Sequence, residues 1–338
     1  MSIDYVKFGS TGMKVSTLCL GTMHFGTPDW RHWVLDEKAS TPVIHAAIER
    51  GINFIDLADF YSHGIGEEVV GRALKGTPRD RLVLASKCFY AMSDDVNDRG
   101  LSRKHIIGAV DASLRRLGTD YLDSYVVHAF DEETPIEETM RALDDVVRSG
   151  KVRYLGASTM YAWQFVKMNY LARLHGLTPF VSMQCQLNAA YREEEREMIP
   201  YCINEGIAVT PFSPLARGLL SGQFDSLRNR TDNFTLSTYS DDTSHAIAMA
   251  VADVARERGV SSSQVAMAWT MGRPGVTSTL IGVETVAQLD EAIAARSLVL
   301  TAPELYSIDR HYTPCDVIND YRVERIARTA RPVLEAIS

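Results

Sequence analysis

The chain has 338 residues, of which 46% are hydrophobic and 23% are charged, so it can bury a large core within a single domain covering residues 1–338. Its formal net charge of −8, without a basic stripe interleaved with aromatic residues, argues against a nucleic-acid partner. The N-terminus lacks a signal-peptide pattern and no run of 18 apolar residues occurs, so the sequence predicts a soluble cytoplasmic protein without a membrane partner.

The first predicted element is a short β-hairpin, with strands at residues 5–8 and 13–16 around a glycine-containing turn. Apolar, strand-like runs then recur, and a segment with helical periodicity follows each of them. Two of the helices have clear limits, at residues 41–50 with a proline in the first turn and at residues 102–117 between a serine and a glycine. The strand-like runs begin near residues 17, 53, 82, 122, 152, 181, 207 and 277.

Eight alternating strand and helix units favour an α/β fold closed into a (β/α)8 barrel, or TIM barrel. The largest predicted insertion is polar and glycine-containing and runs from about residue 216 to residue 242, after the seventh strand. A further helix is predicted at residues 261–271, before the eighth strand. Because barrel enzymes carry their chemistry at the C-terminal ends of the strands, we expect the long loops to surround a site there.

Three of the predicted strands end on an ionisable residue, namely Asp56, Lys87 and His128. Tyr61 follows five residues after Asp56, in a loop that reaches the same barrel mouth. Taken singly, Asp56 is more often a cap, Lys87 a surface charge, His128 a satisfied polar group and Tyr61 a packing residue than a functional group. Their coincidence at adjacent strand ends favours one shared site.

These four side chains suit the reduction of a carbonyl group. A tyrosine with a pKa of about 10 is a poor proton donor at neutral pH unless a nearby cation lowers that value. Lys87 supplies such a cation, Asp56 holds its ammonium group, and His128 is placed to hydrogen-bond the substrate oxygen. No protein side chain donates hydride, so the reaction requires a nicotinamide cofactor.

Residues 51–61 (GINFIDLADFY) and 66–74 (GEEVVGRAL) resemble the first signature of the aldo-keto reductase superfamily, and residues 213–220 (SPLARGLL) resemble its strand-seven signature. The resemblance covers nearly the whole chain and is strongest to bacterial reductases related to aryl-alcohol dehydrogenases and potassium-channel β subunits. It implies an oxidoreductase that interconverts a carbonyl compound (an aldehyde, ketone or sugar) and its alcohol. By this resemblance, Tyr61 is the general acid and base, Lys87 and Asp56 tune it, and His128 orients the carbonyl.

The resemblance also implies an extended cofactor across the barrel mouth, with its nicotinamide stacked on Phe212. Hydroxyl and amide side chains would hold the carboxamide, and the loop after the seventh strand would cover the pyrophosphate. The last helix would receive the adenosine phosphate at its N-terminus, where backbone amides favour anions. The predicted cofactor contacts are Gly21, Thr22, Asp56, Ser158, Thr159, Gln184, Phe212, Ser213, Leu215, Arg217, Gly282, Glu284, Gln288 and Glu291.

Glu284 departs from the superfamily, which commonly places Arg, Lys or Ser near the adenosine 2′-phosphate. Two like charges about 4 Å apart cost about 4 kcal/mol near a protein surface, whereas a carboxylate accepts hydrogen bonds from ribose hydroxyls. We therefore expect NAD(H) to be favoured over NADP(H). Arg228 and Arg230, in the long insertion, are the residues that would act in the opposite direction by reaching the phosphate.

Aromatic and histidine residues gather in the predicted mouth loops and indicate an aromatic aldehyde, a ketone or a sugar as the substrate. With NAD as the cofactor, the working direction could also be alcohol oxidation. The predicted substrate contacts are His24, Phe25, Trp30, Trp33, Phe89, Tyr90 and Phe130.

Two other functions remain open from the sequence. One is a nicotinamide-binding regulatory or partner-binding subunit with little turnover. The other, weaker because Lys87 is expected to pair with Asp56, is an isomerase that uses this lysine as a Schiff base. The five cysteines are far apart and form no CxxC pair, so neither a disulfide framework nor a metal site is predicted. The pattern leaves an oligomer possible.

Overall fold

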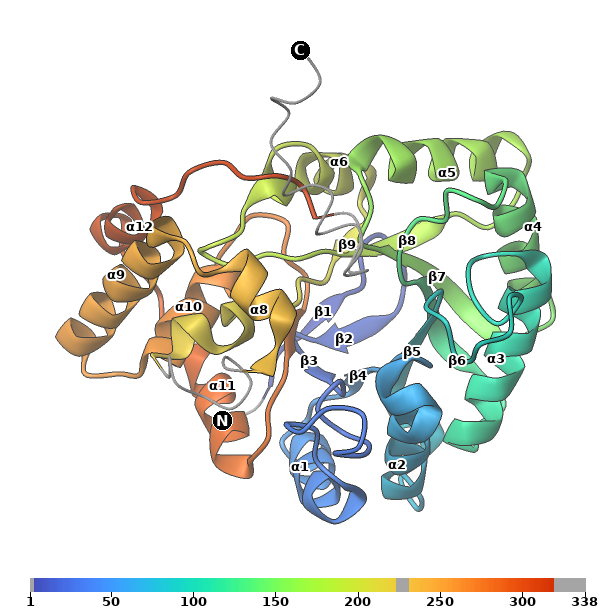
Figure 1. The fold of residues 1–338 in the computed structure, drawn as a ribbon, viewed down its shortest axis with the longest axis horizontal. Helices are drawn as coiled ribbons and strands as arrows, with labels where there is room; N and C mark the ends of the chain where they lie inside the picture. The colour runs from blue at the N-terminus through green and yellow to red at the C-terminus, as the bar shows by residue number, and fades with distance from the viewer. Residues whose placement is uncertain (1–2, 223–230, 319–338) are drawn as a thin grey trace.

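A computed structural model describes residues 3–222 and 231–318 (Figure 1). An antiparallel hairpin, β1 (Tyr5–Lys7) and β2 (Lys14–Ser16), precedes an eight-stranded parallel sheet. The strand order in this sheet is β10-β3-β4-β5-β6-β7-β8-β9. Its members are β3 (Leu18–Gly21), β4 (Phe54–Asp56), β5 (Val83–Cys88), β6 (Leu122–Val127), β7 (Val152–Ser158), β8 (Phe180–Gln184), β9 (Ala208–Val209) and β10 (Thr279–Ile281).

The parallel sheet closes on itself. On one side, β10 pairs in parallel with β3. On the other side, Leu280 donates its backbone N–H to the carbonyl of Pro211 and Thr277 donates to the carbonyl of Val209, both at 2.8 Å. The predicted (β/α)8 barrel is therefore confirmed, and each strand lies within a few residues of its expected start.

The hairpin covers the N-terminal end of the barrel. Phe8, just after β1, packs edge-on against Phe54 at the start of β4, with ring centroids 5.5 Å apart. Both rings belong to a separate apolar cluster with residues from the first positions of other strands, such as Val83 and Ala208. Gly9 has a φ of +60° and lies so close to Gly206 that a Cβ would be 2.6 Å from its carbonyl oxygen. The hairpin therefore closes the end opposite Asp56 and Lys87.

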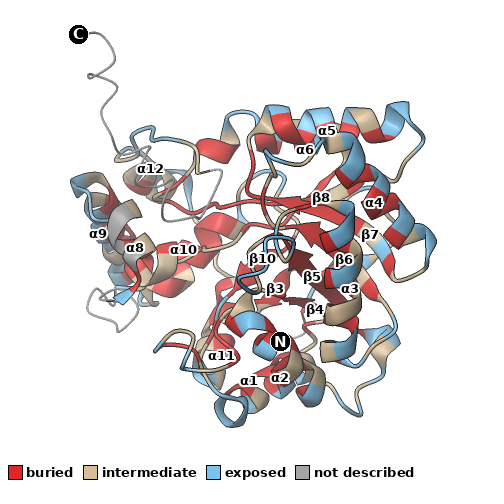
Figure 2. Cartoon of the chain, turned by 45° about the vertical axis from the view of Figure 1, so that its right-hand side comes forward, coloured by how far each residue is buried: buried red, intermediate tan, exposed pale blue. Residues whose placement is uncertain are grey.

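Helices surround the barrel, with their buried faces toward the strands and their exposed faces outward (Figure 2). The described residues include four short 3-10 segments, η1 (Tyr61–Gly64), η2 (Arg79–Arg81), η3 (Glu193–Glu195) and η4 (Ala216–Ser221). Within residues 3–222 and 231–318, no helix is both long enough and apolar enough to cross a membrane. The described α-helices are α1 (Glu37–Glu49), α2 (Ile65–Ala73), α3 (Arg103–Leu117), α4 (Ile136–Arg148), α5 (Ala162–Leu174), α6 (Met198–Glu205), α8 (Asn233–Thr238), α9 (Asp242–Arg258), α10 (Ser262–Met271), α11 (Val286–Ala295) and α12 (Ala302–Asp309).

The helix limits follow their caps. As predicted, α3 begins after the side-chain cap of Ser102 and ends at Gly118, which adopts the left-handed conformation. The predicted start of α1 at residue 41 is wrong, because the helix begins at Glu37 after the side-chain cap of Asp36. Pro42 therefore lies inside α1 and does not mark its first turn.

The insertion predicted at residues 216–242 contains the short segments η4 and α8. Arg228 and Arg230 lie outside the described residues.

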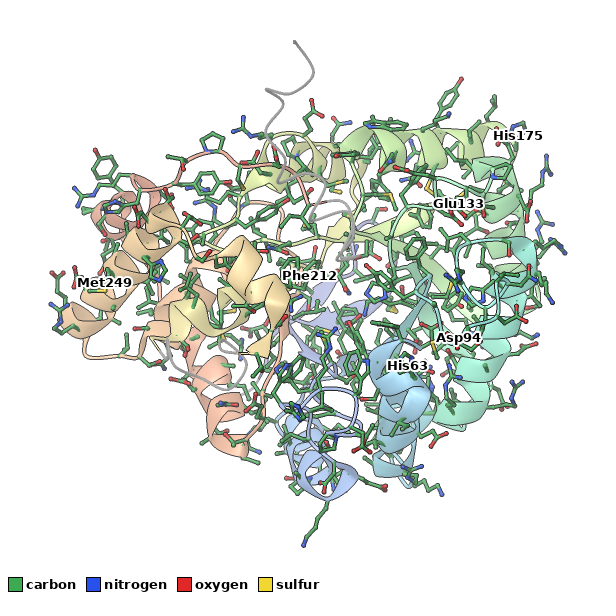
Figure 3. All side chains as sticks on the ribbon, in the orientation of Figure 1. His63, Asp94, Glu133, His175, Phe212 and Met249 are labelled. Atoms are coloured by element: carbon green, nitrogen blue, oxygen red, sulfur yellow. The ribbon has the colours of Figure 1, made fainter. Side chains whose placement is uncertain are left out.

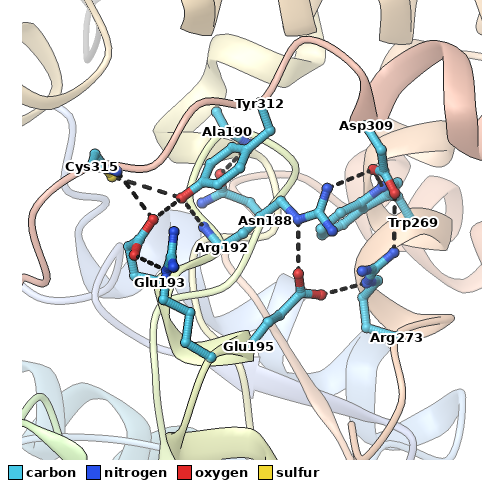
Figure 4. A network of polar contacts seen from close by, with 11 residues as sticks. Asn188, Ala190, Arg192, Glu193, Glu195, Trp269, Arg273, Asp309, Tyr312 and Cys315 are labelled. Atoms are coloured by element: carbon cyan, nitrogen blue, oxygen red, sulfur yellow. Dashed lines mark hydrogen bonds and ion pairs between the residues drawn. The ribbon is translucent and has the colours of Figure 1, made fainter.

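Hydrogen bonds and ion pairs connect the end of α12 and the segment that follows it to the loop after β8 (Figure 4). The Tyr312 hydroxyl donates to Glu193 at 2.6 Å. Arg192 forms an ion pair with Asp309 at 3.1 Å, and Arg273 joins Asp309 to Glu195 in the same network. The end of the described chain is thus held beside a loop at the barrel mouth.

Candidate active site

The structure brings the four ionisable residues together at the C-terminal ends of β4, β5 and β6. Asp56 ends β4, Lys87 is the last residue but one of β5, His128 follows β6, and Tyr61 begins η1. The Lys87 ammonium donates to Asp56 Oδ2 at 2.7 Å and lies 3.3 Å from the Tyr61 hydroxyl. A third bond, to the carbonyl of Leu57 at 2.6 Å, completes the surroundings of Lys87 Nζ. The ammonium group is therefore fixed in position by three oxygen atoms.

Lys87 keeps its charge although its side chain is 0% exposed. Burial alone would lower the pKa of Lys87, but the charges of Asp56 and Tyr61 and the hydrogen bonds to both outweigh burial and raise it above its ordinary value. Lys87 is therefore an ammonium group throughout the physiological pH range. It provides a permanent positive charge beside the Tyr61 hydroxyl.

Burial changes what Lys87 does to Tyr61. Burial raises the pKa of Tyr61, the charge of Lys87 lowers it and the charge of Asp56 raises it, with a net rise above the ordinary value of 10.0. The sequence predicts that Lys87 lowers the pKa of Tyr61, but in the structure the cost of removing the phenolate from water outweighs this effect. Tyr61 therefore holds its proton at neutral pH, and Lys87 limits how far the pKa rises.

His128 is a neutral imidazole. Burial lowers the pKa of His128 well below its ordinary value, and Lys87 lowers it further. The His128 ring lies edge-on to the rings of Tyr61 and Tyr90, at centroid distances of 6.0 and 4.9 Å. A neutral ring beside Tyr61 can donate a hydrogen bond to a substrate oxygen without adding a charge.

A cavity of about 1270 Å³ opens over these residues, and Asp56, Tyr61 and His128 line it while Lys87 lies behind them. Every residue predicted to contact the cofactor also lines this cavity. They are Gly21, Thr22, Asp56, Ser158, Thr159, Gln184, Phe212, Ser213, Leu215, Arg217, Gly282, Glu284, Gln288 and Glu291.

Asp56 determines the orientation of the Gln184 side-chain amide. Gln184 Nε2 donates to Asp56 Oδ1 at 2.8 Å, while the other oxygen of Asp56 accepts from Lys87. A carboxylate paired with an ammonium group only accepts hydrogen bonds, so Gln184 must present its NH2 group to Asp56. The Gln184 carbonyl oxygen is then left to accept a bond from a ligand. This fits the NH2 group of a carboxamide, and the hydroxyls of Ser158 and Thr159, 3.0 Å apart, lie on the same cavity wall.

Phe212 lies near the centre of the molecule in Figure 3. It is partly buried against the apolar cluster that contains Phe54 and Ala208. Its backbone N–H donates to the carbonyl of Cys185 at 2.9 Å. The next residue, Ser213, has a φ of +57°, and its carbonyl accepts from the Asn188 side chain at 3.0 Å. A flat ring held in this way at a cavity wall is suited to stacking on a planar ligand.

Several cavity residues lie in the left-handed backbone region although they are not glycines. These are Thr159, Ser213 and Arg217, with φ values of +46°, +57° and +56°. Such conformations are sparsely populated and cluster at functional sites. None of these three positions is a glycine, so the sequence pattern does not indicate their left-handed conformation.

Glu284 lies at the cavity rim, with 41% of its side chain exposed and Oε1 3.8 Å from His24 Nε2. The His24 ring fits against Gly282, where a Cβ would lie 2.6 Å from the ring. Gln288 accepts from the Glu284 backbone N–H at 2.7 Å, which leaves its amide NH2 for a ligand. His24 therefore lies on the β10 side of the cavity, beside the predicted adenosine end of the cofactor.

Four of the predicted substrate contacts line the cavity, namely His24, Trp30, Trp33 and Tyr90. The structure places the other three elsewhere. Phe25 and Phe89 belong to the main hydrophobic core, with exposures of 0% and 5%, and Phe130 packs against Trp163 at a centroid distance of 6.2 Å. Loop position alone did not distinguish aromatic residues that face the cavity from those that pack beneath the loops.

Arg31, Asp232 and Phe234 line the cavity but are not among the residues predicted from the sequence. Arg31 lies between two predicted aromatic contacts, Trp30 and Trp33, but the predicted substrate contacts include only aromatic and histidine side chains. Asp232 and Phe234 belong to the long insertion, whose course a sequence pattern does not give. The flanking tryptophans were the one available signal for Arg31.

Residues 17–313 match the model of the Aldo/keto reductase family. The chain is 42% identical over 337 residues to versiconal hemiacetal acetate reductase of Aspergillus parasiticus, covering 92% of this chain and 98% of that protein. It is 40% identical over 341 residues to an aldo-keto reductase of Fusarium vanettenii, covering 92% of each chain. It is also 39% identical over 342 residues to a Schizosaccharomyces pombe protein whose name refers to aryl-alcohol dehydrogenases, covering 93% and 97%. These three relatives are fungal proteins.

Proposed function

Because the chain belongs to the aldo/keto reductase family, whose members are oxidoreductases that use a nicotinamide cofactor, we propose that it interconverts an aldehyde, ketone or sugar carbonyl and its alcohol with Tyr61 as the general acid and base. One observation carries this proposal. The Tyr61 hydroxyl lies 3.3 Å from a fully buried ammonium group, and Tyr61 lines the large cavity. A buried phenol next to a permanent cation is suited to giving up and regaining a proton.

In the reductive direction, Tyr61 donates its phenolic proton to the carbonyl oxygen. Lys87 stabilises the phenolate that remains, and Asp56 keeps the ammonium group in place at 2.7 Å. The neutral His128 ring donates a hydrogen bond to the same substrate oxygen as negative charge develops on it. The cofactor, when bound, supplies the hydride to the carbonyl carbon. In the oxidative direction, the Tyr61 phenolate removes the proton from the alcohol.

The cavity walls support a nicotinamide at this position. The Gln184 carbonyl oxygen, left unengaged by Asp56, would accept from the carboxamide NH2, and the Ser158 hydroxyl would donate to the carboxamide oxygen. Phe212 would stack on the ring. The carboxamide would thus be tied to the same aspartate that holds Lys87.

The two directions of the reaction should respond differently to pH. Reduction needs the protonated phenol, and since the pKa of Tyr61 is raised above 10.0, kcat/KM for reduction should be nearly constant between about pH 6 and pH 8. Oxidation needs the phenolate, whose fraction rises about tenfold with each pH unit below the pKa. We therefore expect kcat/KM for oxidation to rise about tenfold per unit in this range. Steady-state profiles in both directions test this, and an oxidation rate that does not change with pH would contradict it.

We further propose that NAD(H) is preferred, on the basis of Glu284 at the cavity rim beside the N-terminus of α11. Replacing Glu284 with Lys should raise the ratio of kcat/KM with NADPH to kcat/KM with NADH by about tenfold or more. The reason is that the repulsion between residue 284 and the adenosine 2′-phosphate of NADPH becomes an attraction. Glu257→Lys, the same change on the exposed surface of α9, is the control and should leave the ratio unchanged. A wild-type enzyme more efficient with NADPH would refute the preference.

The function itself is tested by following cofactor oxidation with 4-nitrobenzaldehyde as a generic carbonyl substrate, with NADH and with NADPH. Turnover that saturates with aldehyde would support the reductase. Tight cofactor binding without turnover on a broad panel of carbonyls and alcohols would instead indicate a regulatory subunit that binds nicotinamide. Cofactor binding is followed separately by fluorescence titration, so the two results are distinct.

A further inference from the structure

We propose that Arg31 recognises an anionic group on the carbonyl substrate, so that the preferred substrates are aryl aldehydes or ketones that carry a carboxylate. Arg31 lies in the loop between β3 and α1 and lines the cavity that contains Tyr61. This inference rests on the proposed function and specifies the substrate class of the same site.

The guanidinium group of Arg31 is held by aromatic rings. Its Cζ atom lies 4.3 Å from the centroid of the Trp30 ring and 5.5 Å from that of Trp33. Stacking a guanidinium face on an indole leaves the N–H groups at its edge available, in the fork geometry that matches a carboxylate. The two tryptophans therefore orient Arg31 without using its hydrogen-bonding capacity.

The charge of Arg31 is not neutralised by a contact within residues 3–222 and 231–318, where the structure shows no hydrogen bond or ion pair from its guanidinium group. The nearby cation Arg217 differs, because it forms an ion pair with Asp232 at 2.6 Å and its guanidinium lies 4.1 Å from the Phe234 ring centroid. Burial lowers the pKa of Arg31 below its ordinary value, and the charge of Asp232 opposes this effect. Asp232 therefore interacts electrostatically with Arg31, while its ion pair at 2.6 Å is with Arg217. A partly buried cation without an ion pair is an electrostatic site for an anion.

Arg31 is close to the reacting centre. The Trp30 ring that carries Arg31 lies 6.5 Å from the Tyr61 ring, between centroids, and edge-on to Phe60 at 5.6 Å. One indole thus separates the guanidinium from the proton donor. A benzene ring with a carbonyl at one end and a carboxylate at the other is of comparable length. Such a substrate would reach Tyr61 and Arg31 together while its ring lies among the aromatic residues of the cavity.

The test compares 4-formylbenzoate with its uncharged methyl ester, because the two aldehydes differ in charge at the far end of the ring. Wild-type kcat/KM should be at least about tenfold higher for 4-formylbenzoate. Arg31→Met should reduce this preference by about tenfold or more, mainly through KM, while Arg31→Lys, which keeps the charge, should retain part of it. Arg81→Met, an exposed arginine in η2 before β5, is the control and should leave the preference unchanged.

Three results would overturn the proposal. The first is an equal wild-type kcat/KM for the two aldehydes. The second is a loss of kcat/KM in Arg31→Met that is the same for both aldehydes. The third is a larger dissociation constant for NADH in Arg31→Met with the aldehyde preference unchanged, which would assign Arg31 to a cofactor phosphate. Tryptophan fluorescence, reported by Trp30 and Trp33, gives the binding constant of 4-formylbenzoate without turnover. If neither aldehyde reacted but wild type still bound 4-formylbenzoate at least about tenfold more tightly than Arg31→Met, the proposed reaction would fail and anion recognition would stand.

Discussion

Tyr61→Phe is expected to lower kcat for carbonyl reduction by about 10³-fold, within the range of about 10² to 10⁴ that general acid catalysis contributes. The substitution removes one hydroxyl group and keeps the ring that packs against Trp30 and His128. The developing alkoxide would then lose the group proposed to give it a proton. Lys87 loses its contact with the Tyr61 hydroxyl but keeps its ion pair with Asp56, so we expect the fold to remain stable.

This experiment needs two accompanying measurements. Tyr306→Phe makes the same chemical change at an exposed residue of α12 and should retain full activity. The dissociation constant for the cofactor should change little in Tyr61→Phe, since the proposed nicotinamide contacts lie on Gln184 and Phe212. If Tyr61→Phe kept more than about a tenth of wild-type kcat, the proton would have to come from another group.

Lys87→Met is expected to damage both catalysis and stability. The charge of Lys87 lowers the pKa of Tyr61, so its removal makes the phenol a weaker acid in an already buried position. The substitution also leaves the Asp56 carboxylate buried without its partner, and breaking one half of a buried pair costs about 3–5 kcal/mol. We expect kcat to fall by about 10²-fold or more and the free energy of unfolding to fall by that amount.

The double variant Asp56→Asn/Lys87→Met separates these two effects. With neither charge present, no uncompensated ion is buried, so most of the lost stability should return. Activity should stay low, because nothing then stabilises the Tyr61 phenolate. Denaturant unfolding and steady-state kinetics on the single and double variants form the cycle. Recovery of both stability and activity in the double variant would mean that the cation has no part in the chemistry.

The sequence was sufficient to predict the barrel and to place four ionisable side chains together at its mouth, because both depend on strong local signals. Buried parallel strands are short apolar runs, and the ionisable residue at the end of each run needs only the barrel topology to be placed at the mouth. Asp56, Lys87 and His128 were located in this way, and Tyr61 by its distance along the chain. The predicted start of α1 is too late because a proline is typical of a first helical turn, whereas here Pro42 lies inside the helix and the cap is Asp36.

What the sequence did not provide depends on burial and on loop conformation. The direction of the Tyr61 pKa follows from how completely the phenol is removed from water, which spacing along the chain does not reveal. Phe25 and Phe89 are in mouth loops but are buried in the core. The sequence pattern alone does not distinguish a buried aromatic residue in such a loop from one that lines the cavity. The role proposed for Arg31 depends on its contacts with the Trp30 and Trp33 rings, which the sequence does not show.

The closure of the barrel through β3 and β10 also constrains how the chain is made. The Ser278 hydroxyl donates to the carbonyl of Ser16 across 262 residues, next to the pairing of these strands. At about 5–20 residues per second, a ribosome needs roughly 13 to 50 seconds to synthesise that stretch. Throughout this interval β3 has no neighbour on one side and presents an open strand edge, which can pair with another chain. A nascent chain released before residue 279 would lack β10 and could not close the barrel, even if the strands that carry Asp56 and Lys87 were already paired.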